Sequence, residues 1–227
     1  MTRRLLLVIL FVLPLLGGWG CGAFYLAGGM AQSFEYQKLV EVLPRYEGLE
    51  HKTVAVIVDA DLGTLHQYQL LPEVISSGVG GLIAREVSGA RVLTSGAVRE
   101  WQFTTPRWNA LPYSDMLKAL QVERIILIDI HTFRLNPPGN RWIWEGECAA
   151  TIGVIEDDGH NPDEFADAYH ITARFPTIKQ LDRDSASPEV IETGLVTEFM
   201  KQTAWLFYPH LEPKYPDRYK PELDQTQ

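Results

Sequence analysis

The chain has 227 residues, a formal net charge of −9 and only two cysteines. Nucleic acids and anionic lipid surfaces bind clustered Lys and Arg side chains, so this charge balance argues against either as a partner. Two cysteines cannot form a disulfide-stabilised scaffold. The length allows one substantial domain, and no linker that would divide it is visible.

The first 34 residues have the pattern of an export signal. Arg3 and Arg4 precede an apolar run that begins at Leu5, and no charged side chain follows until Glu35. A positive segment followed by an apolar segment of this length directs a chain into the secretory membrane. We therefore expect the remaining residues to work outside the cytoplasm, in the cell envelope.

The end of the signal decides how the protein is held at the membrane. Gly20 precedes Cys21, so we interpret residues 1–21 as a signal sequence with a lipobox and Cys21 as the lipidated residue. An uncleaved transmembrane anchor is the first alternative, because the region from Leu5 to about Ala27 is long enough for a spanning helix, which needs roughly 20 apolar residues. Pro14 and several glycines disfavour a continuous helix there. Plain secretion is the second alternative.

The region after the signal predicts a tether with a short amphipathic helix, over residues 22–49. The apolar side chains expected on one side of this helix are Phe34, Leu39, Val40 and Leu43. A folded domain is expected over residues 50–207. Residues 208–227 are rich in proline and charge, which predicts a loosely ordered tail.

The first elements of the domain are a strand and a helix. Thr53–Val58 is a continuous apolar and β-branched run, which is typical of a strand buried on both faces. Pro72 begins a helix that ends near Val87. Each glycine within this helix costs about 1 kcal/mol relative to alanine, and close packing on the sheet is the expected compensation.

The rest of the domain predicts further strands around two helices and a long loop. Expected strands are Arg91–Thr94, Arg124–Ile130, Trp142–Ile155 and Ala168–Phe175; expected helices are Ser114–Leu120 and one that begins at Pro188. A loop rich in Trp, Pro and Thr is expected after the second strand and ends at Leu111. The order β-α-β-α-β-β-β-α predicts a single α/β domain, a two-layer or three-layer sandwich with a mixed sheet.

Several segments of this domain resemble a known family. They are KTVAVIVDAD, GARVLTSGAVRE, LQVERIILIDIHTF and WIWEGECAATIGVIEDDG. Together they resemble the envelope lipoprotein domain shared by the curli-secretion lipoprotein, the amino-terminal domain of TolB and the activators of penicillin-binding proteins. The resemblance implies a non-catalytic binding, assembly or regulatory module that acts on an envelope protein partner without a cofactor. Whether the protein also forms a homo-oligomer stays open.

A second resemblance points to an enzyme. Asp59 and Asp61, in VAVIVDADLGTL, are spaced as in the first motif of haloacid-dehalogenase-type phosphatases, where one aspartate is the nucleophile, the second is an acid/base and magnesium binds between them. Leu62 moves the Gly-Thr pair of that motif by one position. The residues that would complete the site are Thr94 or Ser95, Lys118, Asp157 and Asp158. The preferred interpretation is structural, with Asp59 and Asp61 accepting hydrogen bonds from turn amides.

The aromatic residues give the stronger indication of function. Trp101, Phe103, Trp108 and Tyr113 fall in the predicted loop. Aromatic side chains on loops are favoured anchors for protein partners, so we predict that these four bind the partner; the alternative is a lid over the sheet. The histidines are dispersed and predict no metal site, and Asp129 and His131 are expected to share one face of a strand as a simple polar pair.

Overall fold

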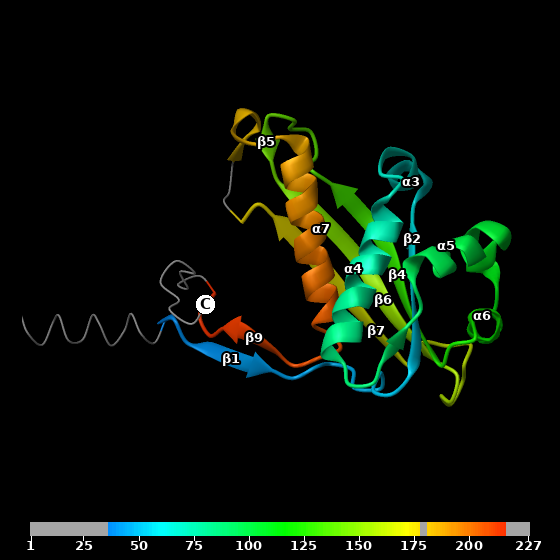
Figure 1. The fold of residues 1–227 in the computed structure, drawn as a ribbon. Coiled ribbons are helices and arrows are strands. Elements are labelled where there is room, and N and C mark those ends of the chain that lie inside the picture. Colours follow the sequence, from blue (N-terminus) through cyan, green and yellow to red (C-terminus); the bar gives the residue numbers. More distant parts are fainter. Residues whose placement is uncertain (1–35, 178–180, 217–227) are drawn as a thin grey trace, which may run out of the picture. The chain divides into compact units, whose positions relative to one another are not determined.

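The computed structural model describes residues 36–177 and 181–216, drawn in colour in Figure 1. The predicted signal sequence, the lipobox and Cys21 lie outside these residues. The described residues divide into two compact units, one of which runs from Leu43 to Pro209. The other comprises the residues on either side of this range.

The smaller unit is a two-stranded antiparallel sheet. Strand β1 (Leu39–Val42) pairs with β9 (His210–Pro213), with Leu39 opposite Pro213. The prediction of an amphipathic helix over this part of the tether was therefore wrong, and the predicted tail contains a strand. Each strand finds its hydrogen-bonding partner near the other end of the chain, which local periodicity cannot reveal.

The larger unit contains the mixed sheet that the sequence predicts. Its strands are β2 (Thr53–Ala60), β3 (Arg91–Val92), β4 (Arg124–Arg134), β6 (Gly146–Glu156) and β7 (Asp167–Phe175). They lie in the order β3-β2-β4-β6-β7; β2 is parallel to β3 and β4, whereas β4, β6 and β7 are antiparallel. A small separate sheet pairs β5 (Ile143–Trp144) with β8 (Leu181–Asp182).

Helices cover the two faces of the main sheet unequally. The helices are α3 (Leu62–Gln67), α4 (Leu71–Glu86), α5 (Ser95–Thr104), α6 (Tyr113–Leu120) and α7 (Pro188–Ala204), with 3-10 turns at Trp108–Ala110 and Arg183–Ser185. α4 and α7 lie side by side on one face (Figure 1). α5 and α6 pack on the other face, against β2 and β4. The sandwich therefore has three layers over β2 and β4 and two layers over β7, whose outward side chains are exposed.

The alternation along β2 explains the two cores. Val54, Val56 and Val58 face α4 and α7, whereas Ala55 and Ile57 face α5 and α6. All five are buried, which fits a strand covered on both faces. The next residue on the α5 and α6 side is polar, and it opens the site described below.

The glycines of α4 allow close packing, in part as expected. A Cβ atom at Gly80 would lie 3.1 Å from Val92 on the sheet, and one at Gly78 would lie 2.1 Å from the sulfur of Met200 on α7. A Cβ at Gly81 would meet nothing within 4 Å. Close packing thus compensates for the low helix propensity of two of these glycines. Gly80 packs against the sheet, and Gly78 packs against α7.

Two predicted elements differ from the structure. Residues 95–104 form α5 instead of a loop, because the Thr94 hydroxyl accepts a hydrogen bond from the Ala97 amide and caps the helix. Trp101 and Phe103 therefore lie on a helix. The predicted strand Trp142–Ile155 is divided into β5 and β6, and Trp142 is 80% exposed and precedes both.

Candidate binding sites

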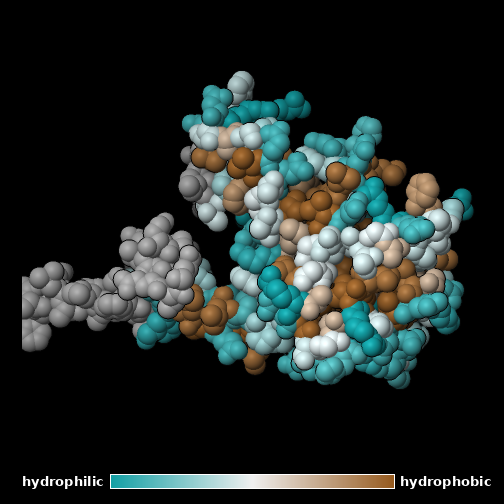
Figure 2. Space-filling view, viewed as in Figure 1, coloured by the Kyte–Doolittle hydropathy of each residue, from teal (hydrophilic) through white to brown (hydrophobic). Residues whose placement is uncertain are grey.

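The larger unit contains a groove of about 1340 Å³ between α4, α7 and the loop that follows β4, which we call the α4–α7 groove. Three large apolar side chains of its lining are exposed to solvent: Leu70 (63%), Val74 (47%) and Trp142 (80%). Figure 2 shows apolar surface gathered between α7 and α4 in this region. Exposed apolar side chains that line one hollow indicate a binding surface.

Buried and partly buried aromatic side chains form the floor of the α4–α7 groove. Tyr68 and Phe133 meet edge to face, with ring centroids 4.7 Å apart. The indole N–H of Trp144, which is buried, donates to the carbonyls of Arg183 and Ala186, each at 3.1 Å. The Arg183 guanidinium in turn lies over the Trp144 ring, 5.3 Å from its centroid. The contacts between Trp144 and Arg183 therefore fix the positions of the side chains at this end of the groove.

The charged lining of the α4–α7 groove is mainly positive. It consists of Arg134, Arg141, Arg183 and Glu192. Arg134 forms an ion pair with Glu147 at 3.1 Å, whereas neither Arg141 nor Arg183 has a carboxylate partner within residues 36–177 and 181–216. Burial, and then the charge of Glu189, raise the pKa of Glu192. Arg183 also donates a hydrogen bond to the Arg141 carbonyl at 3.1 Å. Within the described residues, the remaining N–H groups of the two guanidinium groups can therefore bind an anionic group in the groove.

A second hollow, of about 320 Å³, lies on the other face of the sheet, and we call it the Trp108 cavity. Asp59 on β2 and Asp129 on β4 are register partners on neighbouring strands, and both line it. Asp59 accepts a hydrogen bond from the Ala60 amide at 3.0 Å. Burial raises the pKa of Asp59, and the charge of Asp129 adds to this increase. The cavity therefore brings two carboxyl groups together, one near the carboxyl end of β2 and one in the middle of β4.

Aromatic rings form the walls of the Trp108 cavity. Tyr113 stacks on Phe165, with centroids 5.1 Å apart and planes 20° from parallel. The rings of Trp108 and Trp101 lie with their centroids 6.0 Å apart. The Phe165 ring covers Gly153, where a Cβ atom would lie 2.3 Å from the ring. The absence of a side chain at Gly153 is thus what lets Phe165 occupy its position.

Besides Asp129, three of the residues singled out in the sequence meet at this cavity, and the other aromatic residues lie nearby. Asp59, Trp108 and Tyr113 line it. Phe103 is 89% exposed on α5 and lines an adjoining hollow of about 270 Å³, which Asp59 and Trp108 also border. Trp101 is partly buried against the core. The predicted aromatic set is therefore one surface, in which Phe103 is the most exposed side chain.

A chain of polar contacts extends from the cavity across the sheet. His131 lies with its Nδ1 atom 3.7 Å from the Asp129 carboxylate, in agreement with the predicted polar pair. Its Nε2 atom is 2.7 Å from the Thr151 hydroxyl, which is 3.1 Å from Nδ1 of His170. His131 stands at an irregularity in the pairing of β4 with β6. No group of three or more metal-ligating side chains occurs in the described part of the chain.

The structure brings together only part of the residues of the phosphatase hypothesis, because Ser95 lines the same hollow of about 270 Å³ as Asp59 and the others lie elsewhere. Asp61 caps α3, accepting hydrogen bonds from the Gly63 and Thr64 amides and the Thr64 hydroxyl. Asp158 binds Arg124 at 2.5 Å, at the amino end of β4. Because a strand rises roughly 3.3 Å per residue, Asp158 lies on the order of 20 Å from Asp59. Lys118 is 72% exposed and pairs with Asp115.

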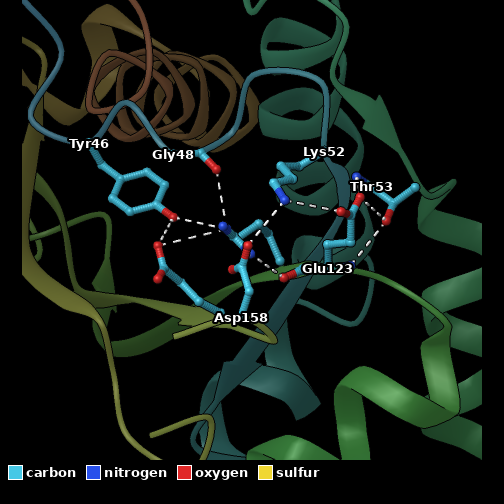
Figure 3. Close-up of polar contacts among 8 residues, drawn as sticks. Tyr46, Gly48, Lys52, Thr53, Glu123 and Asp158 are labelled. Carbon is cyan, nitrogen blue, oxygen red and sulfur yellow. Dashed lines mark hydrogen bonds and ion pairs between the residues drawn. The ribbon is translucent and has the colours of Figure 1, made fainter. Parts of the chain in front are cut away.

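Asp158 belongs to a structural network, shown in Figure 3, that joins the amino ends of β2 and β4 to the turn after β6. Buried Arg124 donates to the Tyr46 hydroxyl and the Gly48 carbonyl, each at 3.2 Å. The Tyr46 hydroxyl donates to Glu156 at 2.5 Å. Lys52 bridges Asp158 and Glu123. Every charge here has a partner, so the network holds the fold and offers no free group to a ligand.

The sequence predictions did not reveal the α4–α7 groove. Its walls come from α3, α4, the loop after β4 and α7, which are far apart along the chain. The signal that was available is Trp142, a large aromatic residue that follows the turn Asn136–Asn140. The sequence pattern assigned it to the start of a long strand.

Comparisons with known proteins give only remote similarities. No protein-family model matches the chain, and no curated protein matches it. The structure is similar to that of PelC from Paraburkholderia phytofirmans, solved as a dodecamer, at 9% identity and a TM-score of 0.44, over 75% of this chain and 97% of that one. It is also similar to lipoprotein GNA1162 from Neisseria meningitidis, at 9% identity and a TM-score of 0.42, over 67% and 95% of the two chains. Similarities this remote carry no argument about function.

The family resemblance drawn from the sequence therefore stays a prediction. The described residues include no helix that is long and apolar enough to cross a membrane.

Proposed function

We propose that the protein is a non-catalytic binding module of the cell envelope, and that its α4–α7 groove holds an apolar, acidic segment of a partner protein. The observation that carries this proposal is the exposure of Leu70, Val74 and Trp142 in one groove of about 1340 Å³. Sites for small molecules usually measure about 300–1,000 Å³. The size of the groove therefore favours a peptide segment.

The charges in the groove specify the acidic part of the segment. Arg141 and Arg183 line it without carboxylate partners in the described part of the chain, although the net charge of the whole chain is −9. Arginine binds carboxylates through two parallel hydrogen bonds, which gives affinity and orientation. A segment with apolar residues along α4 and an acidic residue near Arg141 fits both features.

The envelope location is part of the proposal and rests on the amino-terminal sequence. The apolar run after Arg3 and Arg4 supports export, and Cys21 supports attachment to a lipid. The domain would then face the envelope, held by its amino terminus. A homo-oligomer is compatible with this arrangement.

Photocrosslinking in cells tests the proposal. A photoreactive amino acid replaces Val74 or, separately, Trp142, and the matched control carries it at Lys118, which is exposed on the other face of the sheet. Both groove positions are expected to crosslink to the same partner, at peptides that combine apolar and acidic residues. Arg141→Glu should remove these crosslinks. Crosslinks from the Lys118 position alone, or groove crosslinks insensitive to Arg141→Glu, would contradict the proposal.

The aromatic surface predicted from the sequence is a second candidate for partner binding. Phe103 favours it, because this side chain is 89% exposed on α5. A photoreactive residue at Phe103 distinguishes the two surfaces directly. Partner crosslinks at Phe103 without crosslinks at Val74 or Trp142 would assign partner binding to α5.

A further inference from the structure

The Trp108 cavity combines two features that together select a cation. Asp59 and Asp129 supply negative charge from opposite positions on β2 and β4. Neighbouring strands of a sheet lie about 4.8 Å apart. Trp108, Tyr113 and Phe165 present aromatic rings to the same space. The faces of such rings carry partial negative charge and attract organic cations. We propose that the Trp108 cavity binds a primary ammonium group, as on a lysine side chain of a partner protein.

The cavity lacks a charge that would compensate its carboxyl groups fully. Among the residues that the structure describes, no Lys or Arg lines it. Within residues 36–177 and 181–216, the His131 ring at 3.7 Å is the only ionic partner of Asp129, whose side chain is 55% exposed. Asp59 accepts its hydrogen bonds from a backbone amide and from the Asn109 side chain, both of which are uncharged. An ammonium group between the two carboxyl groups would reduce the repulsion between them.

The size and walls of the cavity restrict the ligand to one side chain. At about 320 Å³ it lies at the small end of the range for ligand sites. Tyr113 and Phe165 are stacked and therefore form a flat apolar wall, along which the methylene groups of a lysine side chain can pack. This site is independent of the α4–α7 groove, because it lies on the opposite face of the sheet.

The test uses the full-length chain in detergent micelles. The probe is Nα-acetyl-lysine methylamide, and the neutral comparison is Nα-acetyl-norleucine methylamide. Binding is followed by NMR on the tryptophan indole N–H signals, with that of Trp108 assigned from Trp108→Phe. We expect saturable movement of the Trp108 signal with the lysine probe and at least roughly tenfold weaker binding of the norleucine probe, which lacks the charge.

Two variants make the test specific. Asp129→Asn should weaken binding of the lysine probe about fivefold, as expected for loss of one exposed ionic contact. Asp115→Asn removes an acidic side chain on α6 that does not line the cavity, and it should leave the affinity unchanged. The proposal is overturned if the two probes bind equally, if the lysine probe does not move the Trp108 signal, or if Asp129→Asn and Asp115→Asn bind the probe alike. None of these outcomes bears on the α4–α7 groove.

Discussion

At the scale of single residues, two groups of charged side chains have different tasks. Arg124, Lys52 and their acidic partners satisfy one another at the amino ends of β2 and β4 (Figure 3). Asp59 and Asp129 are register partners farther along the same strands, and among the described residues no lysine or arginine lines the cavity that they share. Removal of a partner is costly in the first group, because Arg124 is buried. The second group is available to a ligand.

Acid should weaken the Arg124 network. The Thr53 amide and then Lys52 lower the pKa of Glu123 from 4.5 to about 2, and Arg124 and then Lys52 lower that of Asp158 from 3.8 to about 2. Carboxyl groups whose pKa is lower in the folded state contribute stability above their unfolded pKa, and this contribution is lost as the pH falls toward the folded pKa. The free energy of unfolding should therefore decrease between about pH 4.5 and about pH 2.

Urea denaturation at pH 7 and at pH 3 measures this effect. Asp158→Asn should be less stable than the wild type at pH 7, and it should lose less stability on acidification. Asp157→Asn is the control, because the Asp157 side chain has no ion-pair partner in the described part of the chain. An equal loss of stability on acidification in the wild type and in Asp158→Asn would contradict the assignment.

Gly153 has a role that a stability measurement alone would not reveal. In Gly153→Ala the new methyl group would overlap the Phe165 ring. Phe165 is 38% exposed and can turn outward, so we expect a loss of stability below about 1 kcal/mol, at the low end for overpacking. The wall of the Trp108 cavity should nevertheless be lost, and the lysine probe should bind several-fold more weakly. Unchanged probe affinity with a retained fold would show that Phe165 does not contribute.

At the scale of elements, the sequence pattern predicted those helices and strands that are determined by residues close together in the chain. The order of the main strands and helices was confirmed, because β2 and β4 carry apolar runs and α4 and α7 carry apolar side chains at helical spacing. α5 was missed because its Trp, Phe and Thr residues have low helix propensity, and the Thr94 cap was overlooked.

The candidate sites depend on contacts between distant parts of the chain, and most of them could not be predicted. Asp59 and Trp108 were identified in the sequence as separate candidate site residues. Their proximity depends on how α5 and the 3-10 turn pack on β2 and β4. The pairing of Asp59 with Asp129 requires the register of β2 on β4. The α4–α7 groove requires α7 to lie beside α4, which no local pattern specifies.

The glycines of α4 provide a test of packing at the element scale. Gly81 is exposed, and a Cβ atom there would meet nothing within 4 Å. Gly81→Ala should raise the free energy of unfolding by about 0.5–1 kcal/mol through helix propensity alone. Gly80→Ala should gain less, because its Cβ would lie 3.1 Å from Val92. Thermal or urea denaturation of the two variants measures the difference, and a larger gain for Gly80→Ala would contradict the packing of α4 on β3.

At the scale of the whole molecule, the domain and its attachment have separate functions. The described residues supply two candidate binding surfaces on opposite faces of one sheet. The amino-terminal sequence would supply the location. A binding module held at a membrane meets partners in the same compartment at an increased effective concentration.

Lipid attachment is a prediction for the complete protein. Cells labelled with a clickable palmitate should incorporate it into the wild type, and Cys21→Ser should abolish the label and leave an unprocessed precursor. Cys148→Ser is the matched control, because Cys148 is a buried free thiol of the folded domain. Recovery of the wild-type protein with Arg3 and Arg4 at its amino terminus would favour the uncleaved anchor instead.

The affinity of the purified protein for the partner segment identified by crosslinking tests the central claim most directly. Trp142→Ala removes an 80% exposed side chain from the α4–α7 groove, and Phe103→Ala removes an 89% exposed one from α5. Neither change should alter the free energy of unfolding by more than about 0.5 kcal/mol. Binding through the groove predicts that Trp142→Ala weakens the affinity by about 2 kcal/mol, roughly thirtyfold, as is typical for loss of an aromatic anchor, and that Phe103→Ala leaves it unchanged. An unchanged affinity in Trp142→Ala, with a loss in Phe103→Ala, would contradict the claim.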